Sequence, residues 1–149
     1  MRLEFSGSPE IAAPREQVWR RLIDPHFVAG SAPGIESIEA IDPTHFRITS
    51  RIGIGMIRAR LTLDGELSDL VTGTSARMRV RGKGAGSTID VVSAIALKDA
   101  GVGRVHLEWA ATTELSGTVV RAGGRLVEGI ARKLTEEFWE DFARRVAEG

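Results

Sequence analysis

The histidines are the first side chains to consider for metal binding or proton transfer. His26, His45 and His106 lie far apart in the chain, without the His-x-x-x-His or His–carboxylate spacing of a metal site on one element. Two of the three fall on the polar side of predicted strands. The sequence therefore predicts surface histidines and no metal site.

Asp90 is the best candidate for a buried acid or base. The residues around it are apolar in both phases of a strand, and the phase shared with Thr88, Val92 and Ala94 would turn its carboxyl inward. Apolar surroundings would shift its pKa into a range useful for proton transfer. A turn position or a surface carboxylate is the alternative. Because no nucleophile has a neighbouring base, we predict no catalytic residue, no cofactor and a protein that is not an enzyme.

The glycine cluster Gly82-Lys83-Gly84-Ala85-Gly86 has the composition of a phosphate-binding loop. Such a loop needs a strand before it and the amino end of a helix after it, whereas here a second strand follows. Its spacing also fits neither the dinucleotide nor the P-loop fingerprint. The cluster therefore predicts a hairpin turn, and Gly53-Ile54-Gly55 is interpreted in the same way.

Arginines alternate with apolar residues on two predicted neighbouring strands. They are Arg58 and Arg60 on the first strand and Arg77, Arg79 and Arg81 on the second. On the convex face of a sheet they would form a basic stripe able to contact anionic lipid headgroups or an acidic protein. The alternative is pairing with carboxylates of neighbouring strands, such as Asp64, Glu66 and Glu108. No aromatic residues alternate with the arginines, so nucleic acid is not an expected partner.

The composition is that of one ordinary globular domain. The 149 residues are 42% apolar and 27% charged, with 20 basic and 20 acidic side chains, which excludes a disordered chain and a basic nucleic-acid binder. The lack of cysteine excludes disulfides and thiolate chemistry. No segment has the apolar core of a signal peptide or the length of a membrane span. We expect a single domain over residues 1–149 in a soluble, cytoplasmic protein.

The expected elements follow from hydrophobic periodicity and from the positions of glycine and proline. A strand within residues 3–12 is interrupted near Gly7, a helix begins after Pro14 and ends before Pro25, and a second short helix covers residues 27–30. The Pro33-Gly34 pair predicts a type II turn, after which strands of period two follow. About seven strands are expected, in the order strand, two helices, six strands and one long helix. This order predicts an α+β fold with a curved antiparallel sheet.

The last helix leads to the main functional hypothesis. Its amphipathic pattern runs without interruption from about Val119 to Val146. One helix across a curved sheet rarely fills the space beneath it, so we expect a pocket for a small molecule there. Gly123 lies on the buried face, where glycine allows close approach of a strand or a ligand. Asp141 and Arg145 interrupt that face, so the helix should cover the sheet only to about Phe138 and pack its last two turns on the first helix or on another chain.

The predicted cavity is lined by ordinary apolar side chains. Only 5% of the residues are aromatic and none is tyrosine, which favours unfilled space over a filled core, although a filled core remains the alternative. The expected lining residues are Phe27, Phe46, Ile57, Leu61, Met78 and Trp109, together with Gly123, Leu126, Val127, Ile130 and Leu134 from the last helix. His26, beside Phe27, would stand at the mouth of the cavity.

Four blocks of the sequence match a known pattern. They are Phe5-x-Gly7 with Ile11-Ala12-Ala13-Pro14 and Val18-Trp19; Asp24-Pro25 through Pro33-Gly34 with Glu36 and Glu39; the Gly82–Gly86 hairpin; and Gly124-Arg125-Leu126 with Ala131-Arg132-Lys133-Leu134 and Phe138. With these blocks the chain resembles the G-subunit family of carbon monoxide dehydrogenase, within the START-like (SRPBCC) superfamily of helix-grip folds. Where relatives carry a Cys-Ile-Pro-Gly type turn, this chain has Ser31-Ala32-Pro33-Gly34.

The resemblance implies a role beside a molybdenum-containing carbon monoxide dehydrogenase or a similar hydroxylase, in membrane recruitment or in delivery of an electron acceptor. Together with the predicted cavity, it favours a binding or carrier domain for an apolar molecule such as a lipid or an isoprenoid quinone. Membrane contact would be peripheral, through the basic stripe or the cavity mouth, at the inner face of the membrane. Two alternatives stay open: a small cyclase- or hydrolase-type enzyme that uses the same cavity, and an interaction protein without a ligand.

Overall fold

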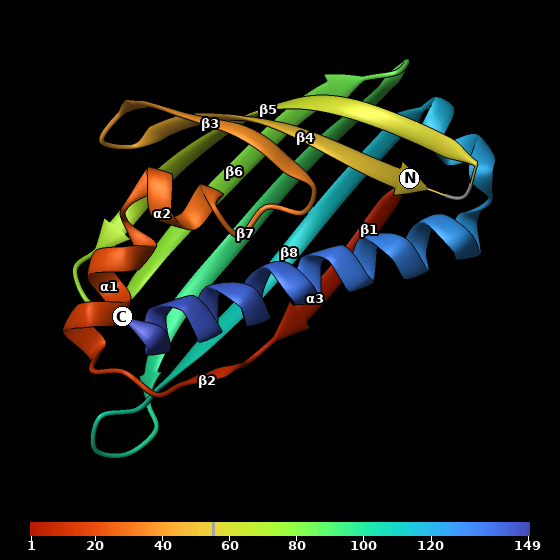
Figure 1. Ribbon diagram of the computed structural model, residues 1–149. Helices are drawn as coiled ribbons and strands as arrows, with labels where there is room; N and C mark the ends of the chain where they lie inside the picture. The colour runs from red at the N-terminus through yellow and green to blue at the C-terminus, as the bar shows by residue number, and fades with distance from the viewer. Residues whose placement is uncertain (55) are drawn as a thin grey trace.

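The computed structural model describes residues 1–54 and 56–149, without the side chains of residues 54 and 57. Two short helices near the start and one long helix at the end accompany a single sheet (Figure 1). The elements are, in order, β1 (Arg2–Gly7), β2 (Glu10–Ile11), α1 (Arg15–Leu22), α2 (Pro25–Ala29), β3 (Ile35–Asp42), β4 (His45–Ile54), β5 (Ile57–Val71), β6 (Ser75–Gly84), β7 (Ser87–Asp99), β8 (Val105–Gly117), the 3-10 helix η1 (Thr118–Ala122) and α3 (Gly124–Glu148).

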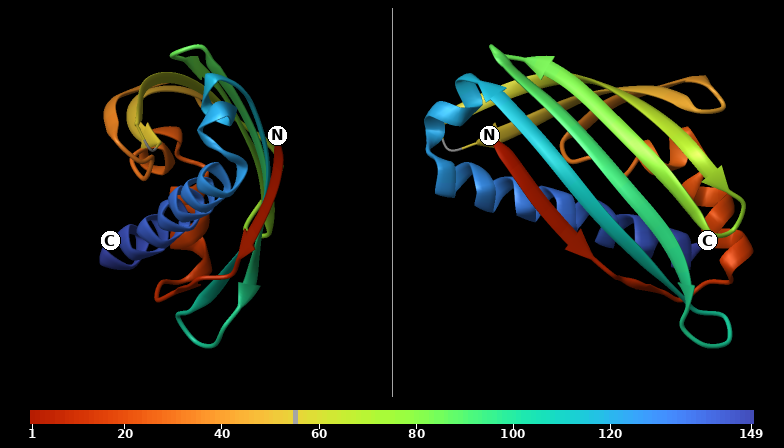
Figure 2. Two further views of the ribbon diagram at one scale, coloured as in Figure 1. Left: turned by 90° about the vertical axis from the view of Figure 1, so that its right-hand side faces the viewer. Right: turned by 180° about the vertical axis from the view of Figure 1, so that it is seen from behind.

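The sheet is antiparallel, with the spatial order β1-β8-β7-β6-β5-β4-β3 and with β2 also paired to β8. It curls strongly around α3, which lies across its concave face (Figure 2). The predicted α+β helix-grip architecture is therefore confirmed. The described sheet has eight strands instead of about seven, because the first predicted strand divides into β1 and β2.

Side chains alternate between the two faces of each strand, as the period of two predicts. On β8 the residues that face α3 are buried: Val105, Leu107, Trp109, Ala111, Thr113 and Leu115. On β6, Ala76 and Met78 are buried, while Arg77, Arg79 and Arg81 in the opposite phase are exposed on the convex face. The concave face is thus apolar and the convex face is charged.

The glycine cluster between β6 and β7 forms a hairpin, as predicted. Gly84 pairs with Ser87, which leaves Ala85 and Gly86 as a two-residue loop. Both have positive φ angles, 50° and 74°, as a type I′ turn requires. The other predicted glycine turn, Gly53-Ile54-Gly55, falls partly outside the described residues.

The last helix is not continuous from Val119, which corrects the prediction. Residues 118–122 form η1, and α3 begins only at Gly124. Between them Gly123 has a φ of 105°, and a β-carbon at this position would meet nothing within 4 Å. Gly123 is therefore needed for its backbone conformation and not for a close approach, because positive φ is strongly disfavoured for other residues.

The C-terminal half of α3 is the half that holds the helix in place. Trp139, Phe142 and Val146 are at most 1% exposed, and Trp139 stacks on Trp109 of β8 with ring centroids 6.3 Å apart. The side chain of Gln17 on α1 donates a hydrogen bond of 2.8 Å to the carbonyl of Val146. The predicted contact of the last turns with the first helix is present. Trp139, one residue beyond the predicted limit near Phe138, still contacts the sheet, and Phe142 then packs on Phe27 of α2.

The segment between α2 and β3 closes over one end of the sheet. Asp24 caps α2 by accepting hydrogen bonds from the backbone N–H groups of His26 and Phe27, at 3.1 and 3.3 Å. Gly34 then turns the chain with a φ of 61°, and a β-carbon there would overlap the carbonyl of Arg51 on β4. The Arg51 N–H donates to the Gly34 carbonyl at 2.8 Å, which fixes this segment to the sheet.

Candidate functional site

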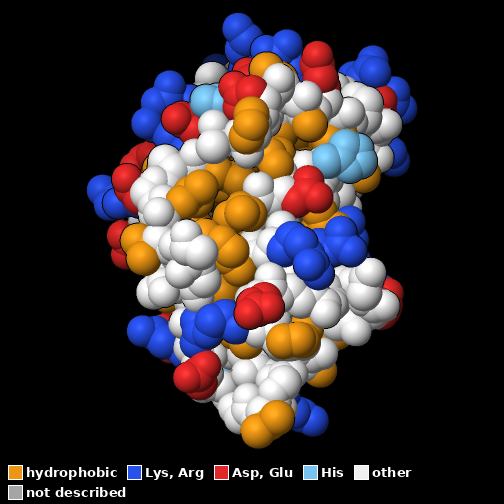
Figure 3. Space-filling view, turned by 90° about the vertical axis from the view of Figure 1, so that its left-hand side faces the viewer, with side chains coloured by type: hydrophobic (Ala, Val, Ile, Leu, Met, Phe, Trp, Pro, Cys, Tyr) orange, Lys and Arg blue, Asp and Glu red, His pale blue; other side chains and the backbone are white. Residues whose placement is uncertain are grey.

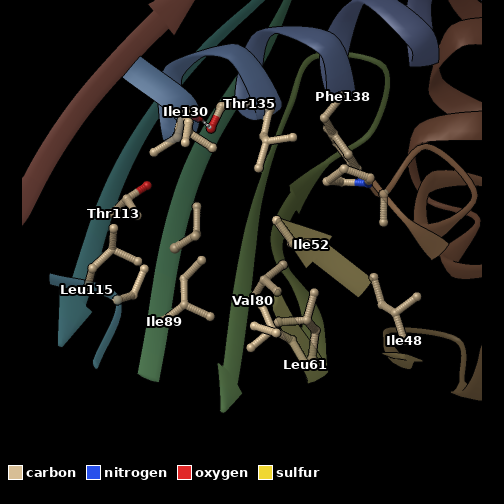
Figure 4. Close-up of a pocket in the computed structure, with 18 of the residues that line it drawn as sticks. Ile48, Ile52, Leu61, Val80, Ile89, Thr113, Leu115, Ile130, Thr135 and Phe138 are labelled. Carbon is tan, nitrogen blue, oxygen red and sulfur yellow. Dashed lines mark hydrogen bonds between the residues drawn. The ribbon is translucent and has the colours of Figure 1, made fainter. Parts of the chain in front are cut away.

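A cavity of about 180 Å³ lies between the first half of α3 and the concave face of the sheet (Figure 4). Its walls come from the segment after α2, from strands β4 to β8, from η1 and from α3. The described lining residues include Ala32 and Pro33; Phe46, Ile48 and Ile52; Ala59, Leu61 and Leu63; Met78 and Val80; Ile89, Val91 and Ser93; Thr113 and Leu115; Val119; and Val127, Ile130, Ala131, Leu134, Thr135, Phe138 and Trp139.

The cavity is open between β4 and the first turns of α3. Ile52 on β4 and Ile130 and Leu134 on α3 line it, yet each is only half-buried. At the opposite end, the stacked pair of Trp109 and Trp139 and the packing of Trp139 on Phe142, with ring centroids 5.8 Å apart, close the space. A ligand would therefore enter beside the amino-terminal half of α3 and stop at the aromatic residues.

The polar groups of the cavity wall are neutral. The Thr135 hydroxyl donates to the carbonyl of Ala131 at 2.7 Å, and the Ser87 hydroxyl accepts from the N–H of Val119 at 2.8 Å. Thr113 is 3% exposed, and its hydroxyl oxygen has no hydrogen-bond partner among the described residues. Among the lining residues that the structure describes, none has a titratable side chain. This wall suits an uncharged, mainly apolar molecule.

Six of the predicted lining residues meet in this cavity. Phe46, Leu61 and Met78 line it from the sheet, and Val127, Ile130 and Leu134 line it from α3. The side chain of Ile57 lies outside the described residues.

Four other predicted lining residues lie elsewhere. Trp109 is buried under Trp139 at the closed end, and Gly123 is the turn before α3. Leu126 is 45% exposed. Because α3 begins only after the break at Gly123, Leu126 lies in its first turn, and Val127 is the first buried residue of the helix. Phe27 packs edge-to-face on Phe142, with ring centroids 5.8 Å apart, in the contact between α2 and α3.

Asp90 does not face the cavity, so the prediction of a polar cavity group there is wrong. On β7 the concave face takes Ile89, Val91 and Ser93, which places Asp90 on the convex face. The Arg79 guanidinium donates two hydrogen bonds to its carboxylate, at 3.1 and 2.7 Å. These bonds hold the pKa of Asp90 below its ordinary value, and the weaker effect of partial burial opposes them. The alternative of a satisfied surface carboxylate describes this residue.

The arginine rows lie on the convex face, away from the cavity, and carboxylates lie beside them. Arg60 pairs with Glu36 at 3.0 Å, Arg77 with Asp69 at 3.8 Å, and Arg79 and Arg81 with Asp90 at 2.7 and 3.9 Å. Arg58 is exposed on the same strand as Arg60. The two rows are also offset, because Asp64 and Glu66 of β5, not Arg58 and Arg60, lie opposite Arg81 and Arg79. The ion pairs neutralise part of the stripe, as in the alternative interpretation.

The three histidines do not meet. His45 is half-buried at the β3–β4 turn, where its Nδ1 lies 2.8 Å from an Asp42 carboxylate oxygen. This hydrogen bond raises the pKa of His45, and it contributes to the lowered pKa of Asp42, whose largest cause is the N–H of Thr44. His26 is exposed on α2 and His106 is half-buried on β8. Within residues 1–54 and 56–149, no cluster of three or more His, Cys, Asp or Glu side chains could hold a metal ion.

Residues that sequence reasoning missed line the middle of the cavity. On β7 they are Ile89, Val91 and Ser93, and on β8 they are Thr113 and Leu115. The signal for β7 was present further along the strand, where Ile95 and Leu97 share their phase and are buried. Thr113 could have been identified because it is a polar residue in the phase of β8 whose other members are apolar.

Hydrophobic side chains also gather on the outside of the molecule. Figure 3 views the end that carries α1 and α2, where they form a shallow recess bordered by charged residues. Ile41 at the end of β3 and Leu70 and Val71 at the end of β5 are exposed. Among the helices that the structure describes, none combines sufficient length with sufficient hydrophobicity to span a bilayer.

A long helix held against a curved antiparallel sheet, with an apolar cavity between them, defines a helix-grip protein of the START-like class. The family is shown by the sequence, since residues 7–147 match the model of CoxG, the G subunit of carbon monoxide dehydrogenase. The chain belongs to this family. Membership associates the protein with a carbon monoxide dehydrogenase system as an accessory component, and the family is not known as catalytic.

Solved structures are similar over nearly the whole chain. A conserved protein from Geobacillus kaustophilus is 24% identical, with 98% of this chain and 96% of that chain covered and a TM-score of 0.86. A START superfamily protein from Mycobacterium smegmatis is 14% identical, with 97% of each chain covered and a TM-score of 0.72. The ZhuI aromatase/cyclase from Streptomyces sp. R1128 is 15% identical, with 99% and 90% covered and a TM-score of 0.59. At these identities the likeness shows the fold alone. Among curated proteins, none matches this sequence.

Proposed function

We propose that this protein binds and carries an apolar small molecule, a lipid or an isoprenoid quinone, in the cavity between α3 and the sheet. The observation that carries the proposal is the wall itself, which is mainly apolar, has hydroxyls as its side-chain polar groups and has no titratable group among its described residues. Burying apolar ligand surface in such a wall contributes roughly 25 cal/mol per Å². No metal or cofactor is needed to hold the ligand.

The size of the cavity limits what the closed part can hold. Its volume of about 180 Å³ is near that of an apolar protein cavity which accommodates a benzene ring, roughly 150 Å³. A single ring system or a short stretch of isoprenoid chain fits this space. The remainder of a longer molecule would leave through the opening between β4 and α3.

The composition of the wall argues against the enzyme alternative. A cyclase or hydrolase needs at least one group that moves a proton or attacks the substrate, held within reach of the reacting atoms. The described wall offers only neutral hydroxyls, and Asp90 lies on the convex face beside Arg79. The cavity itself argues against an interaction protein without a ligand.

Family membership supplies the setting. We propose that the carried molecule serves a molybdenum-containing carbon monoxide dehydrogenase or a similar hydroxylase, as an electron acceptor or as a means of recruiting the enzyme to the membrane. The protein would act in the cytoplasm and meet the inner face of the membrane peripherally. In support, exposed apolar residues lie on the elements that border this side of the cavity, with Leu126 on α3 and Met56 between β4 and β5, and Arg125 and Arg58 are close to them in sequence.

The test is to identify what the protein carries. Natively purified protein is extracted with organic solvent and the extract analysed by mass spectrometry, and thermal unfolding is followed with added quinone or phospholipid. We expect a co-purifying apolar molecule and a rise in Tm, because a ligand at 100 times its Kd stabilises the folded state by about 2.7 kcal/mol. If no apolar molecule co-purifies and no probe raises Tm, the proposal is overturned.

Two variants of the same helix make the test specific. Ile130→Trp places a large ring in the cavity, whereas Leu126→Trp places it on an exposed position of the preceding turn. We expect the first variant to lose the ligand and the second to keep it. Equal ligand content in both variants would mean that the molecule binds elsewhere.

A further inference from the structure

One pair of hydroxyl groups stands out in the part of the cavity wall that β7 and β8 form. Thr113 is the one polar residue among the six inward positions of β8, and Ser93 faces the same space from β7. They are 3% and 2% exposed. In the sheet, Thr113 pairs with Val91 and Ser93 pairs with Ala111, so the two are diagonal neighbours on one face, with Cα atoms roughly 7–8 Å apart.

Thr113 has hydrogen-bonding capacity that the protein does not use. Its hydroxyl oxygen is fully buried and has no partner among the described residues. Figure 4 shows this hydroxyl on the β8 side of the cavity, opposite Ile130 of α3. A buried donor without a partner destabilises the folded state, and valine would fill the same volume without that cost. By contrast, the Thr135 hydroxyl donates to the carbonyl of Ala131, and the Ser87 hydroxyl accepts from the N–H of Val119.

The charge of the wall restricts what could bind to these hydroxyls. No lysine, arginine or histidine is among the described lining residues, so nothing there would compensate a buried carboxylate. Moving an unpaired charge into such a space costs far more than one hydroxyl hydrogen bond returns. A neutral oxygen acceptor carries no such penalty, and a hydroxyl can donate to it directly.

We infer that Thr113 and Ser93 are the specificity-determining residues of the cavity, and that they select a ligand whose inner end carries a neutral carbonyl oxygen. This inference rests on the proposed function and names the chemical class of the ligand. The Thr113 hydroxyl donates to the carbonyl, and Ser93, one diagonal step away, offers a second donor. Ring ketones, quinones and esters fit this requirement, whereas free fatty acids and plain hydrocarbons do not.

Three probes with similar rings separate these classes. They are 2-methyl-1,4-naphthoquinone, which has carbonyls; 2-methylnaphthalene, which has none; and 2-naphthoate, which is charged. Binding to the purified 149-residue protein is measured by equilibrium dialysis. We expect the quinone to bind about three- to tenfold more tightly than the hydrocarbon, as one or two neutral hydrogen bonds would give. The carboxylate is expected to bind most weakly.

The variants assign this preference to the two residues. Thr113→Val and Ser93→Ala should bring the quinone-to-hydrocarbon affinity ratio towards one, while Thr113→Ser should keep it. Thr112→Val, which changes the same residue type on the convex face of β8, is the matched control and should also keep it. The Tm of Thr113→Val without ligand should be unchanged or raised, which separates lost recognition from lost folding.

The outcomes distinguish this inference from the proposed function. If the wild type binds both neutral probes and Thr113→Val and Ser93→Ala leave the ratio unchanged, the cavity binds ligands but these residues do not select them. Tighter binding of 2-naphthoate than of the quinone would also overturn the inference. If the wild type binds none of the three probes, this inference is overturned, and the proposed function is then decided by the co-purification and thermal-unfolding test.

Discussion

The indole of Trp139 on α3 stacks on the indole of Trp109 on β8, with ring centroids 6.3 Å apart and ring planes 21° apart. This contact divides α3 into two parts. Beyond it Phe142 packs on Phe27 of α2, and the carbonyl of Val146 accepts a hydrogen bond from Gln17 of α1; both side chains are fully buried. Before it the helix covers the cavity, and of its residues there only Val127 is buried. The helix is therefore held at one end and covers the binding space with the other.

The Trp109–Trp139 contact should dominate the stability of the helix. We expect Trp139→Ala to lower the free energy of unfolding by about 3–5 kcal/mol, because a fully buried indole is lost and a cavity replaces it. Urea denaturation followed by circular dichroism measures this. Phe138→Ala is the matched control, since Phe138 is half-buried beside the cavity, and its cost should be clearly smaller. Equal costs would show that the two halves of α3 are held equally.

Two glycines near the start of α3 should respond in opposite ways to alanine. Gly123→Ala should destabilise the protein by about 1–3 kcal/mol, because its φ of 105° is strained for any other residue. Gly129→Ala should stabilise it by about 0.5–1 kcal/mol, since Gly129 lies inside the helix and a β-carbon there meets nothing within 4 Å. Thermal unfolding of both variants measures the difference. A stabilising Gly123→Ala would contradict the turn described between η1 and α3.

The sequence was sufficient to predict the fold because local signals agreed along the chain. Alternation marked the strands, proline marked the start of α1 and the turn after α2, and paired glycines marked the β6–β7 hairpin. The prediction failed where strand residues had to be assigned to the concave or the convex face of the sheet. The apolar residues of β7 occupy both faces near Asp90, so that stretch did not reveal which face was buried; the register with β6, where Arg79 lies opposite Val92, decides it.

About half of the predicted lining residues are in the cavity, for a related reason. Residues such as Phe46 and Met78 lie on strands with clear alternation, and they were assigned to the correct face. Trp109 was also assigned to the correct face, but its neighbour on α3 could not be known from spacing, and Trp139 covers it. Of the predicted helix residues, Val127, Ile130 and Leu134 line the cavity, whereas Gly123 and Leu126 do not, because the pattern does not show that Gly123 interrupts the helix. Contacts between distant elements, and not the local pattern, decide which inward residue meets empty space.

Arg145 should connect α3 to the segment that closes one end of the cavity. Its guanidinium donates to the carbonyl of Phe27 and to the hydroxyl of Ser31, both at 2.8 Å, and lies 4.2 Å from the centre of the Phe27 ring. We expect Arg145→Met to lower the free energy of unfolding by about 1–3 kcal/mol and to speed hydrogen exchange at residues 31–32, because two acceptors lose their donor.

The neighbouring arginine is the control for Arg145. Arg144 is exposed and pairs with Asp141 and Glu148 on the surface of α3. Exposed pairs of this kind contribute about 0–1 kcal/mol, so Arg144→Met should have a smaller effect and leave exchange at residues 31–32 unchanged. Similar effects of both substitutions would mean that the loss of a positive charge, and not the loss of the contact with Phe27 and Ser31, lowers the free energy of unfolding.

The β3–β4 turn should make stability depend on pH through His45 and Asp42. The pKa of His45 is raised from 6.5, so its contribution is present below about pH 6.5 and is lost as pH rises through the pKa of the folded protein. The pKa of Asp42 is lowered from 3.8, so its contribution is present above that value and is lost as pH falls through the lower pKa of the folded protein. Their joint contribution is therefore largest between about pH 4 and 6.5. In Asp42→Asn, the pKa of His45 measured by NMR should fall towards 6.5, and Tm should decrease less between pH 5.5 and 8.5 than in the wild type. If the pKa of His45 were the same in Asp42→Asn as in the wild type, the Asp42 carboxylate would not be stabilising the protonated His45 imidazole.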